Sequence, residues 1–283
     1  MTRTVVTGGG GFIGATVARK LVEVGHLVET VGHGSDADAL TPARIAALGT
    51  FDVVVHCAGG SSVAASVQDP RADYEKTVPP FAALLDHVRA RVPRARVVLL
   101  SSAAVYGNAT QIPTPETCPL APVSPYGRHK VECEALCRDR EISCAIVRLF
   151  SVYGAGLRKQ LLWDACKKAR SGDVSFAGTG DEERDWLHVE DAAALIVKVA
   201  AHASPETPVF NGASGIGVRV RDVVGAICRE LGAEAPRFTG TKRTGDPDRY
   251  IADISRARAI GWSPQIDIAR GIAQYVAWFK TQP

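Results

Sequence analysis

The sequence lacks the features that direct a protein to nucleic acid or to membranes. Its formal net charge is only +3 over 283 residues, and its basic residues form no long run. We therefore expect neither nucleic acid nor a membrane surface as a partner. No apolar stretch in the sequence approaches the roughly 18 residues that a membrane-spanning helix needs. The chain begins with a short apolar strand and a glycine-rich turn rather than a secretory signal, so we expect a cytoplasmic protein.

Cysteine patterns typical of metal sites are also missing. The seven cysteines, at positions 57, 118, 133, 137, 144, 166 and 228, form no CxxC pair and show no metal-ligand spacing. Their odd number and scatter indicate reduced thiols that pack as small apolar side chains. We expect no metal site.

Short apolar stretches alternate with amphipathic ones over the first half of the chain. The pattern predicts strands at residues 4–7, 27–31, 51–56, 97–101 and 144–149, and helices at 12–24, 73–91 and 125–140. Strands that are apolar throughout are typical of a parallel sheet covered on both faces. The predicted fold class is therefore α/β, a doubly wound parallel sheet of the Rossmann type.

The chain changes character after Phe150. Glycine and proline become denser, and helices predicted at 159–170, 189–202, 221–231 and 268–279 are separated by longer loops. We expect residues 1–150 to form the Rossmann domain and residues 151–283 to form a smaller C-terminal lobe, with segments of the two interleaving.

A glycine-rich turn lies between the first strand and the first helix. Gly8, Gly11 and Gly14 are spaced G-x-x-G-x-x-G, with Phe12 and Ile13 before the last glycine. Such glycines allow a tight turn, a close approach of pyrophosphate to the backbone, and close packing of helix on strand. The helix N-terminus then offers free N–H groups to the phosphates. This context predicts a dinucleotide cofactor.

The end of the second strand indicates which dinucleotide is preferred. NAD enzymes normally carry a carboxylate there for the adenosine ribose. In this sequence the position falls on Gly32, followed by His33, and neither side chain would repel a 2′-phosphate. We therefore favour NADP(H) over NAD(H). Glu29, earlier in the strand, supplies the carboxylate if the strand register differs, and that alternative stays open.

A second motif places an acid/base group on a helix. Ser124, followed by a proline, is typical of a helix start. Tyr126 and Lys130 then stand four residues apart on one helix face. A neighbouring ammonium favours the phenolate form of a tyrosine. Ser101 and Ser102 end a buried strand, at the sheet edge where ligand-binding side chains gather.

Together these motifs resemble the extended short-chain dehydrogenases/reductases, the nucleotide-sugar epimerase/dehydratase/reductase family, over nearly the whole chain. The resemblance implies an NAD(P)-dependent oxidoreductase in which Ser102, Tyr126 and Lys130 are catalytic. It also implies that the segments 56–59 and 148–154 flank the cofactor. The residues so assigned to the cofactor are Gly8, Gly11, Phe12, Ile13, Gly14, Gly32, His33, Cys57, Ala58, Gly59, Ser101, Tyr126, Lys130, Phe150 and Val152.

The second half of the chain resembles the substrate-binding lobe of this family. Arg184, in the segment Arg184–Asp191, and Arg243, in an R-x-G-D element that ends at Asp246, match arginines that bind a nucleotide diphosphate. The guanidinium fork suits phosphate. The resemblance thus implies a nucleoside-diphosphate sugar as substrate, held by Ser102, Ser151, Arg184, Arg243 and Asp246.

Two alanines depart from the family pattern and narrow the chemistry. Members that eliminate water carry Asp-Glu directly after the catalytic hydroxyl residue, where this sequence has Ala103 and Ala104. Alanine cannot move protons, so dehydration is not expected. Our leading hypothesis is an NADP(H)-dependent reductase of a 4-keto nucleotide sugar. The alternative is an NAD-dependent 4-epimerase. A non-catalytic NADP-sensing regulator is a third possibility, although a sensor has no need of an intact Ser/Tyr/Lys set.

The resemblance also implies a homodimer. In this family the helices that match 73–91 and 125–140 pair with their copies as a four-helix bundle. Residues Phe81, Leu84, Leu85 and Val88 form an apolar stripe at helical spacing that suits such a contact. The alternative, that this stripe only packs on its own sheet, stays open.

Overall fold

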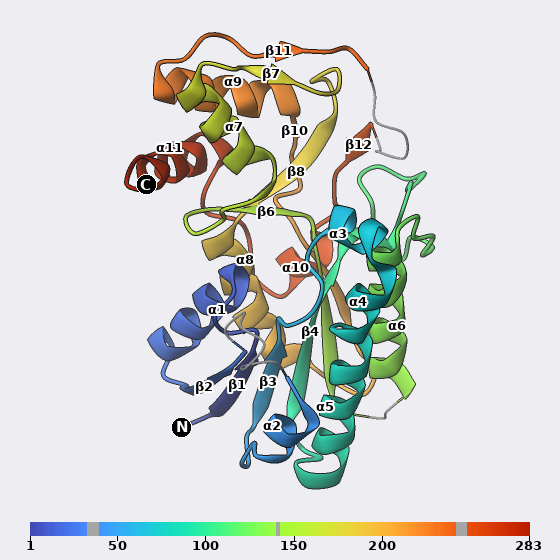
Figure 1. Cartoon of the computed structure of the whole chain (residues 1–283). Helices are drawn as coiled ribbons and strands as arrows, with labels where there is room; N and C mark the ends of the chain where they lie inside the picture. The colour runs from blue at the N-terminus through green and yellow to red at the C-terminus, as the bar shows by residue number, and fades with distance from the viewer. Residues whose placement is uncertain (33–39, 140–141, 242–247) are drawn as a thin grey trace. The chain divides into compact units, whose positions relative to one another are not determined.

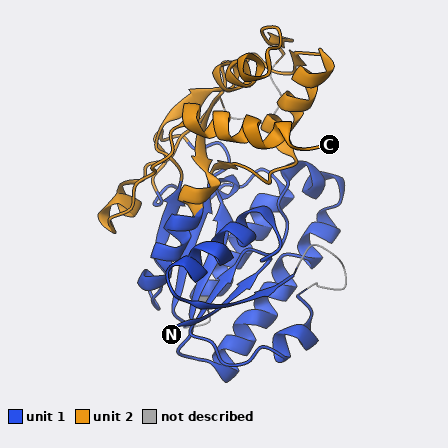
Figure 2. Ribbon diagram, turned by 90° about the vertical axis from the view of Figure 1, so that its left-hand side faces the viewer, with its two compact units in different colours: residues 1–109, 116–149, 193–212 blue, residues 110–115, 150–192, 213–283 orange. Residues whose placement is uncertain are grey.

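The computed structural model describes residues 1–32, 40–139, 142–241 and 248–283. The chain divides into two compact units (Figure 2), which are described separately. Unit 1 comprises residues 1–109, 116–149 and 193–212, and unit 2 comprises residues 110–115, 150–192 and 213–283. Each unit is therefore built from segments that are separated in the sequence.

Unit 1 contains a six-stranded parallel sheet in the order β2-β1-β3-β4-β5-β9. The strands are β1 (Arg3–Thr7), β2 (Leu27–Val31), β3 (Val53–His56), β4 (Arg96–Ser102), β5 (Cys144–Leu149) and β9 (Val209–Gly212). Residues of β3 and β5 are buried throughout, as expected for strands with helices on both faces. The doubly wound α/β fold is confirmed.

Helices cover both faces of this sheet (Figure 1). Helix α1 (Phe12–Glu23) packs on β1 and β2, and the other face carries α2 (Pro42–Ala46), α5 (Val78–Arg91) and α6 (Pro125–Asp139). The short helices α3 (Val63–Gln68) and α4 (Pro70–Glu75) pack beside α6. Helix α8 (Val189–Val199) continues into a 3₁₀ turn over Ala200–His202.

The single helix expected over residues 73–91 is wrong, because the chain forms two helices there, α4 and α5. Pro79 and Pro80 have no N–H group to donate, and proline fits a helix only in its first turn. A new helix therefore begins at Val78, with Thr77 as its N-cap.

The apolar stripe on α5 packs against its own sheet. Phe81, Leu84, Leu85 and Val88 have no exposed surface and belong to the core that also contains strand residues of β3, β4 and β5. Full burial of each such side chain contributes roughly 1.5–3 kcal/mol. The stripe is therefore used within unit 1 and gives no evidence for a partner chain.

Unit 2 contains two small sheets. A four-stranded sheet combines β6 (Ser151–Tyr153), β8 (Glu183–His188), β10 (Gly217–Arg219) and β12 (Arg249–Tyr250). A pair of strands, β7 (Ser175–Phe176) and β11 (Arg237–Phe238), forms the second. Among its described residues the unit also contains the start of α8 and the helices α7 (Gln160–Ser171), α9 (Val220–Leu231), α10 (Ser255–Ala259) and α11 (Ile268–Lys280).

Candidate active site

The glycine-rich turn at the carboxyl end of β1 is tightly packed against neighbouring backbone. Gly8 has a φ of 69° and its N–H donates to the carbonyl of Val31 at 2.6 Å. A Cβ at Gly14 would lie 2.1 Å from the carbonyl oxygen of Gly8, so no other residue fits there. Gly11 is the N-cap of α1. Because glycine has no side chain, no cap residue bonds the first N–H groups of the helix. These features fit a bound pyrophosphate at the start of α1.

The end of β2 lies beside this turn. The carbonyl of Gly32 accepts the N–H of Gly10 at 3.1 Å, and Gly32 has a φ of 85°. Glu29 pairs with Val5 in mid-strand, three residues before Gly32. The residue that follows β2 beside the glycine turn is therefore a glycine, and Glu29 is not at the strand end. His33 lies outside the described residues.

The end of β3 packs against the same turn. A Cβ at Gly8 would lie 2.8 Å from the backbone nitrogen of Ala58, and Gly59 has a φ of 110°. Nδ1 of His56 lies 2.8 Å from Oγ1 of Thr7. Burial, together with the charge of Lys130, lowers the pKa of His56 to about 3, so this histidine is neutral. Segment 56–59 and the glycine turn thus share one edge of the sheet.

The thiol of Cys57 lies at this edge too. Desolvation raises its pKa to about 12, with the charge of Lys130 opposing that rise. The thiol therefore stays protonated near neutral pH, and Cys57 can contribute packing there but no thiolate chemistry.

Tyr126 and Lys130 stand on the first turns of α6. Oγ of Ser124 accepts the N–H of Gly127 at 3.1 Å, which fixes the start of the helix. Lys130 is 5% exposed, and its ammonium donates to the carbonyl of Leu100 in β4 at 3.0 Å and lies 5.8 Å from the centroid of the Tyr126 ring. The buried cation and the phenol are therefore held together at the end of β4.

The two serines at the end of β4 point to different partners. Ser102 is half-buried and its Oγ accepts the N–H of Ala104 at 3.2 Å. The Ser101 hydroxyl is buried and donates to a carboxylate on α6, Glu134, at 2.6 Å. A Cβ at Gly127 would lie 2.6 Å from the carbonyl oxygen of Ala104. The turn after Ser102 and the first turn of α6 are thus in close contact.

A histidine–carboxylate pair joins the same helix to α4. Nδ1 of His129 lies 2.7 Å from Oδ2 of Asp73 in α4, and Asp73 is 1% exposed. The backbone N–H of Tyr126 donates to the hydroxyl of Ser66 in α3 at 3.1 Å. Sequence reasoning did not find this pair. Its one signal is the histidine directly before Lys130.

The remaining sequence-predicted residues belong to unit 2. Phe150 packs its ring 5.1 Å from that of Tyr250, and β6 carries Ser151 and Val152. Arg184 lies in β8, where its Nη1 donates to the carbonyl of Glu183 at 2.9 Å. Arg243 and Asp246 lie outside the described residues.

Asp185 fixes the strand that carries Arg184. Its carboxylate has no exposed surface and accepts four hydrogen bonds, from the backbone N–H groups of Ser214, Gly215 and Ala252 and from the Ser214 hydroxyl. Burial raises the pKa of this carboxyl, although each of these hydrogen bonds lowers it. Asp185 therefore joins β8 to two distant loops of unit 2.

Over the residues that the structure describes, no group of three or more His, Cys, Asp or Glu side chains could hold a metal ion. The helices described there are also too short or too polar to cross a bilayer.

The parallel sheet, the glycine turn and the Tyr/Lys pair at one sheet edge define a dinucleotide-binding oxidoreductase fold. The sequence pattern of the NAD dependent epimerase/dehydratase family matches residues 4–212, and this chain belongs to that family. The family resemblance predicted from the motifs is confirmed. The family uses an NAD(P)-type cofactor.

Similar proteins act on nucleotide sugars. A UDP-glucose 4-epimerase from Mycolicibacterium smegmatis is 30% identical over 315 residues, covering 99% of each chain. A UDP-glucose 4-epimerase from Thermotoga maritima, solved with UDP-glucose, superposes with a TM-score of 0.87 at 26% identity, covering 98% of each chain. A dTDP-glucose 4,6-dehydratase from Streptomyces venezuelae has a TM-score of 0.88 at 25% identity, covering 98% of this chain and 97% of its own.

Proposed function

We propose that this chain is a 4-epimerase of a UDP-hexose, the alternative in the sequence-based hypotheses. The observation that carries the proposal is the Tyr126–Lys130 pair beside a Ser102 turn that has no acidic residue after it. Relatives named UDP-glucose 4-epimerase, which match along nearly the whole chain, support this choice over net reduction.

The proposed chemistry is proton transfer by this chain combined with hydride transfer at one carbon. A bound nicotinamide would accept and return the hydride. Tyr126, as the tyrosinate, would take the proton of the sugar 4-hydroxyl as the ketone forms, and its hydroxyl would return that proton as the ketone is reduced from the opposite face. The Lys130 ammonium would stabilise the tyrosinate. The Ser102 hydroxyl would hydrogen-bond the same sugar oxygen.

The residues after Ser102 argue against elimination of water. Ala103 is buried and Ala104 is half-buried, in the 3₁₀ turn that follows β4. Neither side chain can accept or donate a proton. The proposed reaction therefore moves a hydride and a proton at C4 alone and leaves C5 and C6 unchanged.

Net reduction of a 4-keto nucleotide sugar is the second candidate. One observation favours it: β2 is followed by Gly32, beside the phosphate turn, where a carboxylate would select NAD(H). A reductase would bind NADPH from solution, whereas an epimerase would retain NAD⁺ through its cycle. In either case Arg184, Arg243, Asp246 and Ser151 would bind the nucleotide sugar.

Two measurements separate these candidates. Purified protein is denatured and the released nucleotide is identified by mass spectrometry. UDP-galactose is then incubated with the protein and NAD⁺, and the anomeric proton signals of UDP-galactose and UDP-glucose are followed by NMR. The epimerase proposal predicts interconversion to a fixed ratio without added reductant. UDP-galactose that stays unconverted would refute the epimerase proposal. If the protein then oxidised NADPH when a 4-keto sugar nucleotide was supplied, that result would favour the reductase.

A further inference from the structure

A row of polar side chains crosses three neighbouring strands of unit 1. Ser101 of β4, Arg148 of β5 and Asn211 of β9 are register partners in the parallel ladder. All three are at most 3% exposed. Each lies two positions after an apolar core residue on the same sheet face, namely Leu99, Ile146 and Val209. The row therefore closes the apolar core under α6, next to the end of β4 that carries Ser102.

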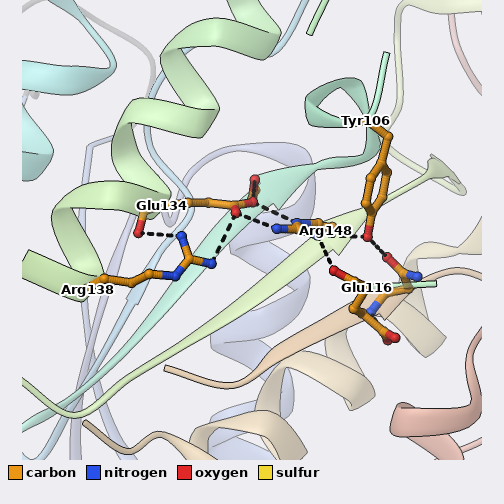
Figure 3. Close-up of polar contacts among 7 residues, drawn as sticks. Tyr106, Glu116, Glu134, Arg138 and Arg148 are labelled. Atoms are coloured by element: carbon orange, nitrogen blue, oxygen red, sulfur yellow. Dashed lines mark hydrogen bonds and ion pairs between the residues drawn. The ribbon is translucent and has the colours of Figure 1, made fainter. Parts of the chain in front are cut away.

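One carboxylate on α6 joins this row. Glu134 has no exposed surface. Nε and Nη2 of Arg148 donate to its two oxygens at 2.9 and 2.7 Å, and the Ser101 hydroxyl donates to Oε1 at 2.6 Å (Figure 3). Burial on its own would lower the pKa of Arg148, but the hydrogen bonds and charge of Glu134 raise it. Arg148 therefore stays charged, and it binds both oxygens of Glu134 in a two-pronged geometry.

The remaining donors of Arg148 extend the network. Its Nη1 donates to the Tyr106 hydroxyl at 3.0 Å and to the carbonyl of Glu116 at 2.9 Å. Tyr106 in turn donates to Oδ1 of Asn211 at 2.7 Å, and Oε1 of Glu116 accepts the backbone N–H of Asn211 at 2.9 Å. Burial raises the pKa of Tyr106 to about 12, against the influence of Arg148, so its proton is available for this bond. The network fixes Arg148 from three sides.

Glu134 shares a helix face with the candidate catalytic residues. Tyr126, Lys130 and Glu134 follow one another at intervals of four on α6, so all three project toward the same side. Lys130 is bound to Leu100 and Glu134 to Ser101, which are consecutive residues of β4. Two contacts one helical turn apart fix both the rotation of α6 about its axis and its shift along β4.

We propose that Glu134 and Arg148 are positioning residues that hold the helical face of Tyr126 and Lys130 in register with Ser102. This inference rests on the proposed function, because the positioned residues are those of the proposed epimerase reaction. A displacement of about 1 Å at a reacting group can cost up to a hundredfold in rate. The pair acts through α6 and touches no reacting atom.

If Glu134 and Arg148 served only the stability of the fold, a variant that stays folded without both charges would keep the wild-type kcat. A buried ion pair can often be replaced by uncharged side chains of similar volume without loss of stability, whereas removing one partner leaves a buried charge unpaired. The double variant Glu134→Gln/Arg148→Met removes both charges together. It leaves an amide that can accept from Ser101, but it loses the two-pronged bond and the donors to Tyr106 and Glu116.

The matched control is Arg138→Met. Arg138 contacts the same carboxylate from the solvent side, with Nη2 3.8 Å from Oε2 of Glu134 and its side chain 46% exposed. This control removes a positive charge near Glu134 and leaves the network below the helix in place.

The test measures thermal unfolding, NAD⁺ affinity, kcat and KM for UDP-galactose, and amide exchange over residues 126–134. We expect the double variant to lower kcat roughly tenfold to a hundredfold with KM within about twofold of wild type, and to speed amide exchange in the first turns of α6. Arg138→Met should change neither. A folded double variant with wild-type kcat and wild-type exchange would overturn the proposal.

Two further outcomes are distinguished. If the double variant does not fold, Ser101→Ala removes only the hydroxyl between β4 and Glu134, and an unchanged kcat with unchanged exchange in that variant overturns the proposal. If the wild-type protein does not turn over UDP-galactose, the proposed function fails. Amide exchange then still tests the positioning of Tyr126 and Lys130, because it needs no substrate.

Discussion

Replacing Lys130 by methionine tests the electrostatic part of the proposed chemistry. The ammonium is buried and lies 5.8 Å from the centroid of the Tyr126 ring. With the tyrosinate charge taken at the ring centre and an effective dielectric constant near 20, the positive charge of Lys130 stabilises the tyrosinate by about 3 kcal/mol. If this stabilisation is needed only as the proton moves, its loss lowers kcat roughly a hundredfold. Methionine has a similar length and no charge.

The effect on stability should be much smaller than the effect on rate. The variant leaves the carbonyl of Leu100 without its side-chain donor, at a cost of about 1 kcal/mol, while it relieves the burial of a charge. Initial rates of UDP-galactose conversion and thermal melts are measured on Lys130→Met and on Lys76→Met, an exposed lysine of unit 1. A Lys130→Met variant that retains half of the wild-type kcat would refute the electrostatic role.

Four further outcomes are expected. The melting temperature should fall as the pH falls from 6.5 toward 3, because His56 binds a proton in the unfolded state but stays neutral in the folded state. His56→Asn should reduce this dependence of melting temperature on pH, and an equal dependence in both proteins would count against the role of His56. Gly32→Asp should weaken NADP(H) binding relative to NAD(H) binding in equilibrium titrations, because a carboxylate there bonds a 2′-hydroxyl and repels a 2′-phosphate; an unchanged ratio of the two affinities would rule out Gly32 as a determinant of cofactor choice. Arg184→Gln should weaken UDP binding about tenfold to a hundredfold in calorimetry, because a charge-assisted hydrogen bond contributes roughly 1.5–3 kcal/mol, with cofactor affinity unchanged. The family resemblance alone implies a dimer, because the α5 stripe is used within unit 1; a single species near 30.0 kDa in sedimentation would contradict that expectation.

The parallel sheet could be predicted where local sequence decides the structure. Strands β2 and β5 match the predicted ranges. All of β5 is buried, as expected for a continuous apolar stretch in a parallel sheet, whereas β2 lies at the sheet edge and buries only Val31. Strand β9, the sixth of the sheet, was missed: it has four residues, and its partner β5 lies some 60 positions earlier. Strand β8 was also missed, because Glu183–His188 contains three charged residues before its apolar ones.

The candidate site could be predicted only as far as its motifs extend. Ser102, Tyr126 and Lys130 each belong to a short pattern whose spacing has a chemical reason. Glu134 and His129 lie on the same helix, but their partners come from β5 and α4, and no spacing rule links them. Ser101 shows the same limit: its position at the strand end suggested a ligand contact, whereas its hydroxyl is bonded to Glu134.

The most direct test of the central claim follows the hydrogen at C4 of the sugar. UDP-galactose labelled with deuterium at C4 is incubated with the wild-type protein and NAD⁺ in ordinary water, and the UDP-glucose formed is analysed by NMR and mass spectrometry. If Tyr126 moves only the hydroxyl proton while the C4 hydrogen moves as hydride, the product retains deuterium at C4, and Tyr126→Phe forms product at least about a hundredfold more slowly. UDP-glucose that carries solvent hydrogen at C4, or a Tyr126→Phe variant that is as fast as wild type, would contradict the account.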